Sequence, residues 1–151
     1  MNTKNDTPHI HRISIGQKKG ERKINVSRAV VHSGAGIDGD AHNDSDRPIS
    51  LLPLESFVKV AHPDLDVEPG DFAENITTMA LDFDQLKIGT RVRMGSGVEL
   101  EIVQIGKECH LGCVIREKVG DCIMPREGVF AKAIRGGEIT VGDTIEIVRP
   151  R

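Results

Sequence analysis

The stretch 84–105, DQLKIGTRVRMGSGVELEIVQI, contains the clearest strand pattern in the chain. Apolar and polar residues alternate on both sides of the glycine-containing turn at 95–97. Two alternating segments joined by such a turn are typical of an antiparallel β-hairpin. In the second segment Val98, Leu100 and Ile102 share one face, because side chains along a strand point alternately to its two sides. The stretch therefore predicts two adjacent strands that bury one face.

Short strands are expected along the rest of the chain as well. Its 16 Gly and 7 Pro residues divide the sequence into segments that are too short for long helices and are rich in Val and Ile. The strands are expected over 9–15, 26–32, 48–52, 98–105 and 129–134, and two short strands are expected within 139–148, on either side of a turn at 142–143; the segment 74–78 is expected to be extended. Apolar residues spaced as on one face of a helix predict a short helix over 54–61, and a second is expected over 110–119.

The fold class follows from these segments and the chain length. The chain has 151 residues, which is about one domain. Roughly seven to nine short strands in such a chain bury their apolar faces best as a barrel. We predict a mainly β fold: a closed or partly closed β-barrel of short mixed strands with two or three small helices. The domain is expected to span 9–149, after a disordered N-terminal tail over 1–8.

Composition excludes several classes of function. The net charge is -3, so no general attraction to nucleic acid is expected. Only 3% of the residues are aromatic, with no Trp or Tyr, which argues against a base-stacking platform. No apolar run is long enough to span a membrane, and the first residues do not resemble a secretory leader. With 3 Cys residues, an odd number, we expect a cytoplasmic protein with reduced thiols.

The densest group of reactive side chains lies at 106–113, GKECHLGC. A thiolate at Cys109 would be stabilised by the ammonium group of Lys107 and by free backbone N–H groups at a helix start. Such a thiol is suited to act as a nucleophile or as a ligand for a soft metal. Alternatively, Cys109 and Cys113 are small buried residues on one helix face. A zinc site is a third reading, but its spacing is unusual because Cys122 lies alone nine residues after Cys113.

Three further clusters contain polar residues suited to bind a ligand. In the loop 38–42, Asp40 and His42 can form hydrogen bonds, and Arg47 can bind an anionic group. The alternatives there are a solvated acidic turn or a calcium loop, although the order of the acidic residues does not match an EF-hand. The turn at 69–76 contributes Asn75. The segment 121–128 contributes Arg126, which is either an anion contact or a surface salt-bridge partner.

These clusters, in this order, resemble the MOSC family, named for the carboxy-terminal domain of molybdenum cofactor sulfurases. The resemblance covers most of the chain, and its matching segments are 36–42, 47–52, 69–78, 86–90, 104–109 and 136–145. It implies a β-barrel domain that binds the molybdenum cofactor or handles sulfur destined for it. Family members have one functional cysteine after a strand that ends in a Gln-containing segment. Counted from Gln104, that cysteine is Cys109, with Cys113 as the alternative.

The resemblance also implies a set of roles for the site. Cys109 would carry a persulfide or ligate molybdenum, because molybdenum and persulfide chemistry both require a thiolate. The phosphate of the cofactor would bind Arg47, Lys107 and Arg126, and the edge of its pterin would bind Asp40, His42 and Asn75.

The implied partners are a pyridoxal-phosphate-dependent cysteine desulfurase as sulfur donor and the molybdenum cofactor, or a molybdoenzyme, as acceptor. This favours a sulfurtransferase-like activity within molybdenum cofactor biosynthesis. Two alternatives remain open: a small molybdoenzyme that reduces N-hydroxylated compounds with a partner reductase, and a binding domain without catalysis. No nucleic acid or membrane partner is expected.

Overall fold

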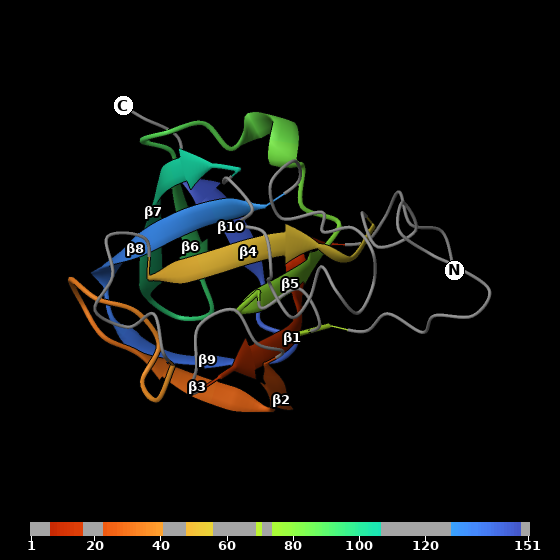
Figure 1. Cartoon of the computed structure of the whole chain (residues 1–151). Helices are drawn as coiled ribbons and strands as arrows, with labels where there is room; N and C mark the ends of the chain where they lie inside the picture. Colours follow the sequence, from red (N-terminus) through yellow and green to blue (C-terminus); the bar gives the residue numbers. More distant parts are fainter. Residues whose placement is uncertain are drawn as a thin grey trace, which may run out of the picture.

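A computed structural model describes residues 7–16, 23–40, 48–55, 69–70, 74–106 and 128–148 (Figure 1). These residues form ten β-strands, numbered in chain order. The strands are β1 (His9–Ile15), β2 (Ile24–Val26), β3 (Arg28–Val31), β4 (Ile49–Pro53), β5 (Ile76–Met79), β6 (Arg91–Met94), β7 (Val98–Ile105), β8 (Val129–Arg135), β9 (Gly137–Thr140) and β10 (Ile145–Val148). The mainly β class expected from the sequence is therefore confirmed.

Eight of the strands form one sheet in the order β10-β6-β7-β8-β4-β5-β1-β2, and β3 pairs with β9 in a second, two-stranded sheet. The β4–β5 pair is parallel, and the other ladders are antiparallel. Figure 1 shows β3 and β9 in the lower part of the molecule, beside β2. Val31 of β3, Ile139 of β9 and Ile37, which forms an isolated bridge with Val31, belong to the same buried cluster as the core residues of the larger sheet.

The predicted barrel closure is wrong, because the larger sheet is open. Its two edges are β10 and β2, and no ladder joins them in the described residues. The start of β1 approaches the start of β10 through an isolated bridge between His9 and Thr144. Farther along, β2 takes the same edge of β1 by pairing with residues 13–15. Only the first residues of β1 therefore have this edge free to pair with the start of β10.

The predicted helices are not seen in the part of the chain that the structure describes. The only helical element with assigned bounds there is the 3-10 turn η3 (Phe83–Gln85), whose N-cap Asp82 accepts a hydrogen bond from the backbone of Asp84. The helix expected over 54–61 falls mostly outside the described residues, and the one over 110–119 falls wholly outside. The tail expected over 1–8 is described only at its last two residues. No described helix is long and apolar enough to cross a membrane.

The hairpin predicted from the 84–105 stretch is confirmed. Strands β6 and β7 pair in antiparallel register, with Met94 opposite Val98 and Val92 opposite Leu100. The core-facing side chains of both strands are almost fully buried. The rest of the core is also aliphatic, as the composition requires. Its largest fully buried side chains are Ile10, Ile13, Ile37, Ile49, Leu51, Leu52, Ile76, Leu86, Met94, Leu100 and Ile102.

Candidate functional site

Two of the seven predicted site residues, Asp40 and Asn75, lie in the described part of the chain. The other predicted residues lie outside it, so their roles stay predictions; they are His42, Arg47, Lys107, Cys109 and Arg126. The alternative thiol Cys113 and the third cysteine, Cys122, also lie outside.

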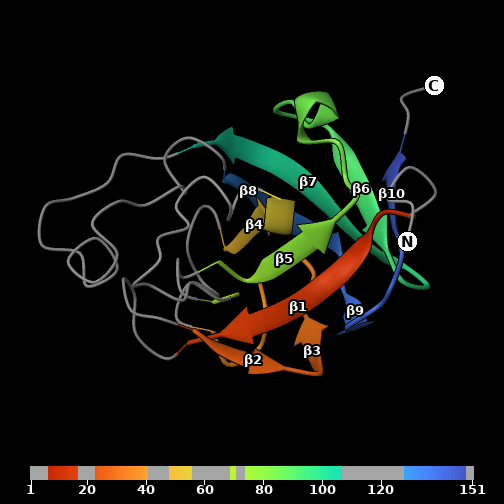
Figure 2. The ribbon, with the colours of Figure 1, turned by 90° about the vertical axis from the view of Figure 1, so that its right-hand side faces the viewer.

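The ends of β1 and β7 can be followed in Figure 2. There the arrowheads of β1 and β7 point to the same side of the molecule. The segment 107–127, which contains all 3 cysteines, follows directly after β7 and Gly106. The segment 41–47 lies between Asp40 and Pro48, just before β4.

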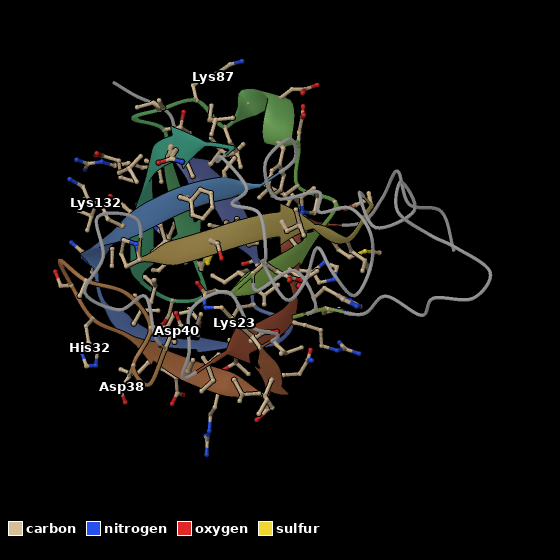
Figure 3. All side chains as sticks on the ribbon, in the orientation of Figure 1. Lys23, His32, Asp38, Asp40, Lys87 and Lys132 are labelled. Atoms are coloured by element: carbon tan, nitrogen blue, oxygen red, sulfur yellow. The ribbon has the colours of Figure 1, made fainter. Side chains whose placement is uncertain are left out.

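A buried ion pair fixes Asp40. The Lys23 Nζ atom lies 2.6 Å from Asp40 Oδ1, and the two side chains are 1% and 0% exposed. The same Oδ1 atom accepts a hydrogen bond from the backbone N–H of Gly16 at 3.0 Å. Asp40 is therefore tied both to the end of β1 and to the residue that precedes β2. Figure 3 shows Lys23 and Asp40 well inside the outline of the molecule.

Glu74 is a second buried carboxylate, with 0% of the residue exposed. Its Oε2 atom accepts hydrogen bonds from the backbone N–H of Gly70 at 2.9 Å and from Thr77 Oγ1 at 2.8 Å. Gly70 in turn accepts a hydrogen bond from the backbone N–H of Lys23. Gly70 has a φ of +96°, and a Cβ atom there would lie 2.5 Å from the Lys23 carbonyl oxygen, so this turn requires glycine.

The Asn75 side chain joins three strands. Its Oδ1 atom accepts hydrogen bonds from the backbone N–H of Ser50 at 3.0 Å and from Ser50 Oγ at 3.3 Å. Its Nδ2 atom donates to the Ser14 carbonyl oxygen at 3.1 Å. The residue is only 1% exposed. Asn75 therefore connects the start of β5 to β1 and β4, a structural role that its sequence position does not reveal.

These contacts form one continuous set, which we call the polar framework. Its members are buried polar or charged residues near the ends of β1, β4 and β5, just before β2, and in the loop between β3 and β4: Ser14, Lys23, Asp40, Ser50, Glu74 and Asn75. Ser14 Oγ is buried and has no hydrogen-bond partner among the residues that the structure describes. The turn at Gly70 lies beside it, since a Cβ atom on that glycine would be 3.1 Å away.

The chemistry of the polar framework suits positioning more than catalysis. Its ionisable groups are one ammonium and two carboxylates, all engaged in short contacts. No group of three His, Cys, Asp or Glu side chains able to hold a metal occurs among the residues that the structure describes. A soft metal such as molybdenum prefers thiolate ligands, and every cysteine of the chain lies in 107–127. The donor set of the chain thus fits a molybdenum group only through that segment.

Sequence reasoning missed Lys23 and gave Glu74 no role. Lys23 ends the polar run 17–23, QKKGERK, which contains three other cationic residues with the same local pattern. Glu74 lies within the turn segment that was singled out, but nothing local marks its burial. Only the long-range contacts between segments distinguish these two residues.

The exposed contact between His32 and Asp38, which lies two residues before Asp40, provides a contrast. His32 Nε2 lies 3.2 Å from Asp38 Oδ1, and the two side chains are 49% and 69% exposed. Figure 3 shows both at the edge of the molecule. Adjacent acidic residues of one loop, Asp38 and Asp40, therefore occupy opposite environments.

Comparison with known proteins identifies the family. A model of the MOSC domain matches residues 38–146, which is more than half of the chain. The chain belongs to the MOSC domain family. No curated protein shows significant sequence similarity to it.

Several solved structures share the fold of this MOSC domain. The YuaD protein from Bacillus subtilis superposes with a TM-score of 0.77 at 20% identity, covering 94% of this chain and 96% of that one. YiiM from Geobacillus stearothermophilus gives 0.73 at 21% identity, covering 94% and 75%. YiiM from Escherichia coli gives 0.69 at 18% identity, covering 95% and 71%. At these identities the likeness concerns the fold.

Proposed function

We propose that this MOSC domain binds the molybdenum cofactor, or carries sulfur destined for it, through Cys109. The observation that carries the proposal is the family match over 38–146. That range includes all seven predicted site residues, from Asp40 to Arg126. The polar framework supports the proposal, because it holds Asp40 and Ser50, which lie on the two sides of the segment 41–47 in the sequence.

The proposed chemistry of Cys109 is sulfur transfer. Its thiolate attacks the outer sulfur of a persulfide carried by a cysteine desulfurase, and a new S–S bond forms on Cys109. The S–S bond of the donor breaks at the same time, and the donor cysteine leaves as a thiolate. Lys107, two residues before the thiol, would favour the ionised form of Cys109.

The cofactor would be held by the cations and polar groups assigned from the sequence. Arg47, Lys107 and Arg126 would bind its phosphate, because a phosphate needs cationic donors. His42 would bind the edge of the pterin. The bound group would supply a molybdenum centre, for which the Cys109 thiolate is a suitable soft ligand.

The direct test is sulfur loading of the purified chain. The protein is incubated with a cysteine desulfurase and cysteine, and its intact mass is measured before and after reduction. We expect one reducible sulfur atom on the parent and on Cys113→Ser, and none on Cys109→Ser. The sulfur-carrier role would be excluded if Cys109→Ser took up sulfur as the parent does.

A further inference from the structure

The strand β10 is one edge of the larger sheet, and its outer side is only partly paired. The backbone N–H of Gly95 donates to the Thr144 carbonyl oxygen, and hydrogen-bonded pairs alternate along the antiparallel ladder between β6 and β10. The backbone groups of Ile145 and Ile147 therefore point away from β6. They face the side on which the start of β1 lies (Figure 2).

Pro8 ends the pairing of the chain with this edge of β10. The backbone N–H of Ile145 donates to the Pro8 carbonyl oxygen at 2.8 Å, so the two residues face each other. The Ile145 carbonyl would accept the return bond from the opposite N–H group, but proline has none. The Ile145 carbonyl and both backbone groups of Ile147 are thus without a partner among the residues that the structure describes.

A groove of about 540 Å³ lies along this open part of the edge. Its apolar lining includes Leu81, Ile145 and Ile147, and the first two are 7% and 3% exposed. Its charged lining consists of Asp82 and Glu146, and no Lys or Arg lines it in the described part of the chain. The groove therefore combines apolar side chains and open backbone groups with negative charge.

The wall formed by residues 80–85 is held in a defined conformation. Ala80 has a φ of +62°, and it is the only described residue other than glycine in this left-handed region. The Glu55 carboxylate stabilises it by accepting a hydrogen bond from the Ala80 N–H at 2.8 Å. Asp82 caps the turn η3 that follows. Local backbone strain of this kind is common at binding sites, and a preformed wall lowers the entropic cost of binding.

We propose that this groove binds an extended, basic segment of a partner protein, which adds to the larger sheet as a strand beside β10. The backbone of such a segment would satisfy the open groups of Ile145 and Ile147, as strand addition requires. Its Lys or Arg side chains would complement the carboxylates of Asp82 and Glu146. The inference goes beyond the proposed function and does not depend on it, because no cysteine takes part.

The position of the groove would allow the partner to bind without covering the other end of the molecule. Figure 2 shows β10 on the side opposite the arrowheads of β1 and β7. A segment bound beside β10 would therefore leave the ends of these two strands accessible.

The test measures the binding of labelled synthetic peptides to the full chain by fluorescence anisotropy. The probe is a short peptide in which valine alternates with lysine. One control peptide carries glutamate in place of lysine, and a second carries N-methyl groups on its backbone amides, which removes the donors that strand addition needs. We expect the lysine peptide to bind and each control to bind at least about tenfold more weakly.

Variants of the chain locate the binding site. Ile147→Pro removes an N–H that points away from β6, so β10 should still form, while affinity for the lysine peptide should fall at least about tenfold. Asp82→Asn should weaken the lysine peptide about threefold, as expected for an exposed charge pair. Asp84→Asn is the matched control, because Asp84 is exposed in the same turn but does not line the groove. We expect it to bind as the parent does.

Amide resonances distinguish this edge from the other edge of the larger sheet. The edge strand β2 contains Ile24, whose side chain is 73% exposed. We expect the lysine peptide to move the resonances of Leu81 and Ile147 and to leave that of Ile24 in place.

The proposal would be overturned if the lysine peptide did not bind the parent, if the N-methylated peptide bound equally well, or if only the Ile24 resonance moved. Slow hydrogen exchange at the Ile147 amide of the free monomer would show that the chain itself covers the edge. A dimer of the parent that Ile147→Pro abolishes would assign the edge to a second copy, and either result contradicts the proposal. If Ile147→Pro does not fold, the comparison of the two lysine peptides on the parent still decides the question.

Discussion

The outer face of the large sheet, on the side opposite the core, differs between its two halves. On β6, β7, β8 and β10 it carries charged side chains that are between 18% and 73% exposed, which we call the charged face: Arg91, Arg93, Glu99, Glu101, Lys132 and Glu146. On β1, β4 and β5 part of the same face is buried, although it contains polar side chains. They include Ser14, Ser50 and Thr77.

The comparison of the two halves shows how burial changes the contribution of polar interactions to stability. On the charged face the ion-pair distances run from 3.3 to 4.0 Å, and water screens the charges. In the polar framework the charged groups and the Asn75 amide have lost water, and each of them has a specific partner. The charged face therefore tolerates change, and the polar framework does not.

The largest expected effect is that of Lys23→Met, which leaves the Asp40 carboxylate buried without its ammonium partner. We expect the free energy of unfolding to fall by about 3–5 kcal/mol. Chemical denaturation measures this loss. A loss below about 1 kcal/mol would mean that the Lys23–Asp40 pair contributes no more to stability than an exposed ion pair does. The two halves would then not differ in this respect.

The next largest effect is expected for Asn75→Ala. This substitution leaves the Ser50 amide and the Ser14 carbonyl without their partner in a buried place, at a cost of about 2–3 kcal/mol. Asn25→Ala is the matched control, because the Asn25 side chain donates one hydrogen bond to Pro69 at an exposed position. The same denaturation measurement should give a loss of less than about 1 kcal/mol for the control. Equal losses would contradict the structural role of Asn75.

A smaller effect is expected for Arg93→Met on the charged face. Arg93 is 48% exposed and lies 3.6 Å from Glu99 and 3.9 Å from Glu146. Removing it should lower stability by less than about 1 kcal/mol, and less still at high salt. Denaturation at two salt concentrations checks both statements. A larger loss that salt leaves unchanged would show that the charged face resembles the polar framework.

The smallest effect concerns pH. Burial, followed by the nearby charges of Arg12 and His9, holds the pKa of His11 below its usual value of 6.5, while Glu55 acts in the opposite direction. Protonation below that value therefore favours the unfolded chain, and stability falls as the pH drops through and below 6.5. His11→Gln should make this decline shallower, as measured by unfolding at about pH 7 and about pH 5. An equally steep decline in the variant would exclude a contribution from His11.

The sequence predicts the charged face far better than it predicts the polar framework. The β6–β7 hairpin and its charged outer side can be read from alternation, because Val92 and Leu100 turn inward while Arg93 and Glu99 turn outward. Each of these assignments depends only on local spacing along the chain. The confirmed burial of β4 likewise follows from its apolar run.

The polar framework could not be predicted in this way. Lys23 and Asp40 are separated by 17 residues, and no periodic pattern connects them. The open sheet could not be predicted from the sequence either, because closure depends on which strand pairs with the free edge of β1. The sequence identified the segments that carry the candidate site, and the burial of Asp40 and Asn75 required the fold.

The most direct test of the account is the cofactor content of the chain purified from a host that makes molybdenum cofactor. Molybdenum and pterin are measured together for the parent, Cys109→Ser and Asp40→Asn. The account predicts both in the parent, in equal amounts, with a clear loss in each variant. A parent that contains neither, or variants that retain as much as the parent, would contradict the proposed binding of the cofactor.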